Sequence, residues 1–117
     1  MGISFKIDTE EGVIYSVAEG KLGFEDLKTY METLRADSNF STNLVHIFEI
    51  RMAQQNISEL EIKALASALP VEHTKRFAIV AHGVKRDLAL KYKESVKGLP
   101  VEVFTDFNSA WEWVLSD

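Results

Sequence analysis

Apolar and polar side chains alternate at the start of the chain, which is the pattern of a strand with one buried face. Residues 3–8, ISFKID, place an apolar side chain at every second position. Glu11 and Gly12 follow as a turn signal, and the apolar stretch VIYSVAEG then occupies residues 13–20. Two strands joined by a short glycine-containing turn usually pair in antiparallel fashion. The sequence therefore predicts an N-terminal β-hairpin.

Beyond residue 23 the spacing of apolar residues alternates between helical and strand-like. Apolar positions every three or four residues predict helices, and short apolar runs between them predict strands. The predicted helices are 24–36, 58–69, 84–97 and 108–115, and the predicted strands are 44–50, 76–82 and 101–107. The order is thus ββαβαβαβα, which calls for parallel strands joined by right-handed crossovers in an α/β fold.

The ends of these helices have recognisable signals. Pro70 is expected to end the second helix, because the residue before a proline disfavours helical backbone. Gly98 and Pro100 are expected to close the third helix, and Asn108 or Ser109 to cap the fourth. No repeat or low-complexity linker interrupts the pattern, so residues 1–117 are predicted to form one domain.

Charged side chains inside the predicted strands indicate that the two faces of the sheet differ. Parallel sheets with helices on both faces have nearly continuous apolar strands, and this chain does not. We therefore expect the helices mainly on one face, with the other face at least partly open. The residues expected on the open face are Lys6, Ser16, Glu102, Val45, Ile47, Val80 and Phe104.

That face would present an apolar stripe framed by polar groups. Such a stripe is typical of a partner surface, and two-fold dimers are the commonest use of one. The pattern predicts a homodimer. A helix or the hairpin lying over the stripe is the monomeric alternative.

Composition narrows the classes of partner and chemistry. The 117 residues have a net charge of −5, which disfavours nucleic acid because its binding needs a basic surface. The absence of cysteine excludes disulfides and thiol chemistry. No apolar run is long enough to span a membrane. The expected location is the cytoplasm.

Three segments resemble the STAS superfamily, and more narrowly its small SpoIIAA-like (STAS/SEC14-type) proteins. They are AEGKLGFEDLKTY at 18–30, RFAIVAH at 76–82 and VEVFTDFNSAWEWVL at 101–115. The resemblance implies a β-α superhelix with neighbouring parallel strands. It also implies a regulatory binding module, since the best-known members are switched by phosphorylation of a serine at the start of the second helix.

Ser58 occupies the corresponding place in the stretch QQNISELE, and three roles are open to it. The family's phosphoacceptor segment, roughly Asp-Ser-Ser-Gly, is replaced here by Gln-Asn-Ile-Ser at 55–58. A nucleophile would need a nearby base and an oxyanion hole, and the G-x-S-x-G motif is absent. Ser58 and Glu61 do have the spacing of a capping box. The sequence favours a helix cap over a phosphorylation switch or a nucleophile.

Other catalytic and metal-binding patterns are missing. His46, His73 and His82 are scattered, without the spacing of metal ligands. Walker and dinucleotide-binding glycine motifs are absent too. We therefore expect no cofactor, no metal and no enzymatic activity.

One turn remains a candidate site, for a small anion. His82, Gly83, Lys85 and Arg86 join the end of a strand to the start of a helix, where open α/β sheets usually bind ligands. Free N–H groups and three basic side chains there would hold an anion, and Arg51, after the preceding strand, is expected beside them. A solvated basic turn is the structural alternative.

Two functions follow from these observations. The first is a non-catalytic STAS-like regulatory module that binds a protein partner or a small anionic or apolar ligand. The second is a small α/β enzyme or a nucleotide or anion binder that uses the strand ends around Arg51 and His82.

Overall fold

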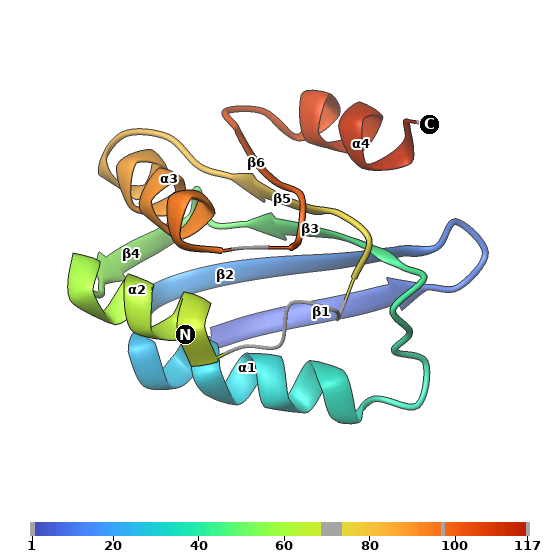
Figure 1. Ribbon diagram of the computed structural model, residues 1–117, viewed down its shortest axis with the longest axis horizontal. Coiled ribbons are helices and arrows are strands. Elements are labelled where there is room, and N and C mark those ends of the chain that lie inside the picture. Colours follow the sequence, from blue (N-terminus) through green and yellow to red (C-terminus); the bar gives the residue numbers. More distant parts are fainter. Residues whose placement is uncertain (1, 69–73, 97, 117) are drawn as a thin grey trace.

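The computed structural model describes residues 2–68, 74–96 and 98–116, and Figure 1 shows how they are arranged. In this part of the chain the elements follow the predicted order, with one additional strand. They are β1 (Gly2–Asp8), β2 (Val13–Gly23), α1 (Phe24–Ala36), β3 (Val45–Glu49), β4 (Ala53–Asn56), α2 (Glu59–Ala68), β5 (Phe77–Val80), α3 (Val84–Ser95), β6 (Val101–Phe104) and α4 (Phe107–Leu115).

The strands form a mixed sheet in the order β1-β2-β3-β5-β6. β1 pairs antiparallel with β2, as the hairpin prediction requires, and the other pairs are parallel. β2 is eleven residues long and continues beyond β3 to pair with the short strand β4. The prediction of an α/β fold is confirmed, whereas β4 was not predicted.

The two faces of the sheet are covered by different helices. α1, α2 and α3 pack on one face, and in Figure 1 α4 lies apart from α1 and α2. α4 packs on the opposite face, where Ala110 and Val114 contact strand side chains. The buried strand residues on this face are Val13, Val45, Ile47, Ala78 and Val80.

This arrangement corrects the prediction of an open face. Val45, Ile47, Val80 and Phe104 do share the face opposite α1, but α4 covers them, so the stripe on which the predicted dimer depended is not exposed. Ser16 was placed on the wrong face. It is fully buried and contacts Tyr30 of α1, because the alternation along β2 puts Ile14, Ser16 and Ala18 on the three-helix side.

Helix caps explain where α2 and α4 begin. The Ser58 hydroxyl accepts from the Glu61 N–H at 3.1 Å, and Glu61 accepts from the Ser58 N–H at 3.0 Å, so the predicted capping box is confirmed. The predicted cap of α4 is wrong. Asp106 caps it by accepting from the Ser109 N–H at 2.8 Å, and this bond is the main cause that lowers the pKa of Asp106.

The end of α2 borders residues that are not described, whereas the end of α3 is described. α2 is described to Ala68, and α3 ends at Ser95, before the extended backbone of Val96, so it is two residues shorter than predicted. The predicted last residues of these helices, Leu69 and Lys97, lie outside the described residues, as does Pro70.

Arg76 fastens the end of α4 to the sheet. This residue precedes β5, and its guanidinium donates to the backbone oxygens of Trp113 and Ser116 at 2.6 and 2.9 Å. The guanidinium also lies over the Trp113 ring, 5.4 Å from the centroid. Both carbonyls lie at the C-terminal end of α4, where the Trp113 oxygen also accepts from the Ser116 N–H at 3.2 Å. Arg76 therefore adds to the cap of α4 and ties the helix to β5.

Candidate functional site

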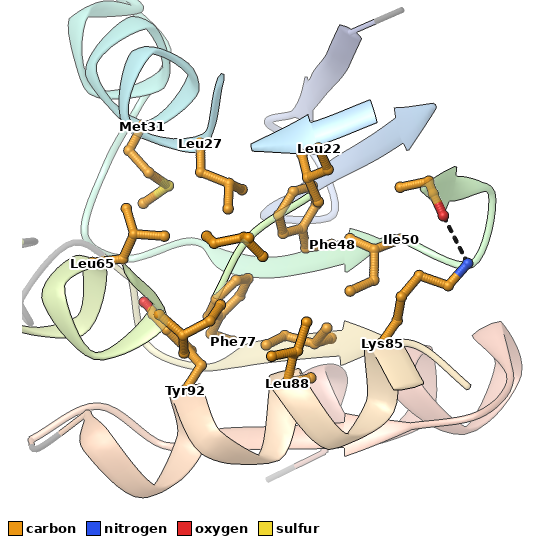
Figure 2. A pocket seen from close by; sticks show the side chains of 15 residues that line it. Leu22, Leu27, Met31, Phe48, Ile50, Leu65, Phe77, Lys85, Leu88 and Tyr92 are labelled. Carbon is orange, nitrogen blue, oxygen red and sulfur yellow. Dashed lines mark hydrogen bonds between the residues drawn. The ribbon is translucent and has the colours of Figure 1, made fainter. Parts of the chain in front are cut away.

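An apolar pocket lies between the sheet and the three helices α1, α2 and α3. Figure 2 shows side chains of all three helices pointing toward the same space. Its volume is about 80 Å³, and its walls are apolar. The lining residues are Leu22, Leu27, Met31, Phe48, Ile50, Ala53, Ile57, Ile62, Leu65, Phe77, Ile79, Lys85, Leu88, Ala89 and Tyr92.

The shape of the pocket follows from the helix sequences. Leu27 and Met31 are four residues apart on α1, and Leu88 and Tyr92 are four apart on α3, so each pair stands on one helical face. Leu65 contributes from α2. Three helices pointing branched aliphatic side chains at one place leave a gap between them, and that gap is the pocket.

Lys85 forms one end of this pocket. Its aliphatic chain lines the wall, while its ammonium donates to the carbonyl oxygens of Arg51 at 2.6 Å and Ala53 at 2.8 Å. The bond to Ala53 is the dashed line in Figure 2. Lys85 thus ties the start of α3 to the segment between β3 and β4, with its charge turned away from the apolar wall.

The structure brings together only some of the residues of the predicted anion site. The bond from Lys85 to Arg51 confirms that these residues are neighbours. The Arg51 guanidinium, however, forms a two-pronged ion pair with Glu49, with its closest contact at 2.6 Å. These hydrogen bonds raise the pKa of Arg51, against the opposing effect of burial. Two of the four predicted basic groups therefore already have protein partners.

The remaining members of that turn are on the surface. His82, Gly83 and Arg86 are exposed, and Gly83 has a φ of 64°, a conformation that favours glycine. An anion site formed by the exposed residues stays a prediction.

A buried polar cluster was not predicted from the sequence. The Tyr30 hydroxyl lies 2.7 Å from Nε2 of His46, and the Ser16 hydroxyl contacts both of these groups. All three side chains are at least 95% buried. Burial raises the pKa of Tyr30 well above its usual value, while the bond to Ser16 opposes this. Because each hydroxyl has partners and no access to solvent, the cluster is a satisfied part of the core.

His46 of β3 is a core residue that is 2% exposed. His73 lies outside the described residues. In the described part of the chain no group of three histidine, aspartate or glutamate side chains could hold a metal ion. Nor is any described helix long and apolar enough to cross a membrane.

Comparison with known proteins supports the fold. The structure is similar to the crystal structure of an uncharacterized protein of the DUF3478 family with a SpoIIAA-like fold from Shewanella loihica PV-4. The TM-score is 0.68 at 21% sequence identity, and the match covers 97% of this chain and 94% of that one. No protein-family model and no curated protein matches the chain. The chain therefore has a SpoIIAA-like fold, as the resemblance implied.

Proposed function

We propose that this protein is a non-catalytic binding module that holds a small apolar ligand between the sheet and helices α1, α2 and α3. The observation that carries this proposal is the pocket itself, which has apolar walls and lies beneath three helices. Ligand sites are usually concave and largely apolar. The apolar walls of this pocket suit an apolar ligand.

The placement of polar side chains supports binding over chemistry. Lys85 turns its ammonium toward two backbone carbonyls, and the hydroxyl and imidazole groups of Ser16, Tyr30 and His46 are engaged with one another. A general acid, base or nucleophile has to reach the reacting group. None of these four side chains presents such a group to the pocket.

The volume indicates what fits. A dry cavity of about 150 Å³ in another protein binds benzene or xenon. At about 80 Å³ this pocket suits a smaller apolar ligand, or the apolar end of a longer one. Met31 is the adaptable part of the wall, because its unbranched side chain changes rotamer easily.

Xenon is a suitable first probe, because it has no polar group and is small. Methyl NMR spectra of the protein under xenon pressure should show shifts at Leu65 and Leu88, which line the pocket. The same spectra should show no change at Val114, on the α4 face of the sheet. Unchanged pocket methyl signals at saturating xenon would contradict the proposal.

A pair of variants tests whether the pocket is the site. Ala89 lines the pocket and is 4% exposed, so Ala89→Leu should fill the space and abolish the xenon shifts. Ala64 is on the exposed side of α2, so Ala64→Leu makes the same change away from the pocket and should leave binding intact. Equal effects of the two substitutions would place xenon elsewhere.

A further inference from the structure

β1 is an edge strand with an unpaired side. Among the described residues it pairs with β2 alone, and Figure 1 shows it at the border of the sheet next to α1. Such an edge presents backbone N–H and C=O groups that can accept a further strand. Ile3, Phe5 and Ile7 face the three-helix side here but are only half-buried. The edge is therefore incomplete in both hydrogen bonding and apolar burial.

A groove runs along this edge between β1 and α1. It has a volume of about 270 Å³, and Gly2, Ile3 and Phe5 form its strand side. Its helix side consists of Asp26, Thr29, Tyr30 and Thr33. A strand beside a groove that receives its side chains is how domains bind extended segments by β-addition.

The sequence of β1 is complementary to itself when two copies run antiparallel about Phe5. In this register all seven residues pair: Ile3 faces Ile7 of the second copy, Phe5 faces Phe5, Ser4 faces Lys6 and Gly2 faces Asp8. Side chains that lie directly opposite share a face. The apolar side chains of both copies therefore meet on the groove side, and no like charges are opposed.

We propose that two copies of this chain associate by antiparallel pairing of their β1 strands about a two-fold axis through Phe5. The pairing joins the two sheets into one and places Ile7 of each copy beside the groove of the other, next to Ile3. This interface is distinct from the α4-covered face, and it does not involve the apolar pocket. The partner is a second copy because its own β1 matches the edge in length and in the alternation of apolar and polar positions.

The exposed position Ser4 tests both the dimer and its register. Ser4 faces Lys6 of the other copy twice per dimer, so Ser4→Glu adds two opposite-charge pairs and Ser4→Lys adds two like-charge pairs. Cross-strand pairs of this kind should tighten the dimer about two- to thirtyfold with Ser4→Glu and weaken it by a similar factor with Ser4→Lys. Sedimentation equilibrium between about 1 and 200 µM, the range of weak interfaces, measures both.

Two further comparisons make the result specific. The double variant Ser4→Lys/Lys6→Glu should regain the affinity that Ser4→Lys loses, because the swapped charges face each other again. Asn108→Glu and Asn108→Lys make the same charge changes at an exposed position of α4 and should leave the dimer unchanged.

Two outcomes would overturn the proposal. One is an unsubstituted protein that sediments as a 13.2 kDa monomer at every concentration. In that case the β1 edge could pair only with a strand of a different protein. The other is a dimer that responds equally to Ser4→Glu and Ser4→Lys, because its interface would then lie elsewhere.

Discussion

The two faces of the sheet are buried by different means. On one face three helices lie side by side and point mostly aliphatic side chains at the space between them. On the other a single helix, α4, lies over the strands and packs with large rings. Phe104 is 5.8 Å from Trp113, and Phe107 is 5.3 Å from Tyr15, measured between ring centroids.

This difference explains where the pocket is. Where three helices pack against one sheet, their side chains have to fill the space at the junctions between the helices. Leu27, Leu65 and Leu88 leave part of this space unfilled. A single helix has no such junction, and the flat rings of Trp111 and Trp113 cover the strands beside it. The ligand capacity that we propose is thus separated from the α4 face. The predictions below test that separation, from the largest expected effect to the smallest.

Phe77→Ala should have the largest effect, because Phe77 belongs to the pocket wall and to the aromatic core at once. It is 5% exposed, and its ring stacks on His46 at 4.6 Å between centroids. We expect a loss of about 3–5 kcal/mol in the free energy of unfolding, measured with urea. The vacated volume adds to the pocket, so benzene near ten times its dissociation constant should restore about 1.4 kcal/mol.

Val114→Ala is the matched change on the α4 face, where Val114 is 3% exposed. It should cost less, and benzene should restore none of the loss. Equal restoration in both variants would show that the faces do not differ in ligand capacity.

Alkaline pH should destabilise the three-helix face more than the α4 face. Burial raises the pKa of Tyr92 to about 12, above its ordinary value near 10. The stabilisation from keeping this phenol neutral is therefore fully present below about pH 10 and is lost as pH rises through about 12, roughly 2–3 kcal/mol in all. Urea titrations across this range should show the loss, and Tyr92→Phe should remove that part of the pH dependence.

Tyr15, on the α4 face, provides the comparison. Burial and the nearby Glu49 carboxylate raise its pKa, while Arg51 opposes them. In an absorbance titration of the folded protein, Tyr15 should ionise before Tyr92, which Tyr15→Phe would identify. Ionisation of Tyr92 first would contradict the burial argument.

Arg76→Ala should loosen α4 and leave the other face intact. The change removes charge-assisted bonds to the Trp113 and Ser116 carbonyls and the contact with the Trp113 ring. We expect a loss of about 1–2 kcal/mol and faster amide exchange in α4, without change in α1. Arg76→Lys retains the charge but cannot form the same set of bonds, so it should recover only part of the loss. Uniform acceleration of exchange would show that α4 is not a separate unit.

Ser58→Ala should have the smallest effect. It removes the hydroxyl that accepts from the Glu61 N–H at the start of α2, which should cost about 1 kcal/mol in a urea titration. Xenon binding in the pocket should persist, because Ser58 is exposed and does not line it. Unchanged stability, or phosphate on Ser58 in the native protein, would contradict the role of a cap.

Much of the fold could be predicted from the sequence, because apolar spacing marks the elements that bury a face. β4 was missed because its residues, AQQN, have no strand-like alternation and pair only with the far end of β2. The cap of α4 was misplaced because Phe107 resembles the end of a strand, whereas Asp106 before it supplies the capping carboxylate. These errors concern short segments, where local pattern is weakest.

The site was harder to predict. The adjacency of Arg51 and Lys85 followed from strand order, but the pairing of Arg51 with Glu49 depends on side-chain geometry. The lining of the pocket comes from strands, loops and three helices, and its residues are ordinary core residues in the sequence. Likewise Ser16, Tyr30 and His46 are far apart in the chain and form no motif. A site formed by core residues that are far apart in the chain produces no recognisable pattern in any one stretch of the sequence.

The position of α4 also has a consequence for folding during synthesis of the protein. Chains are synthesised from the N-terminus at roughly 5–20 residues per second, so residues 2–104 can begin to fold before α4 has left the ribosome. During that interval Val45, Ile47 and Val80 are an open apolar surface on a sheet that is otherwise complete. A released chain that ended after β6 would therefore expose this apolar surface of the sheet, and α4 is the element that conceals it.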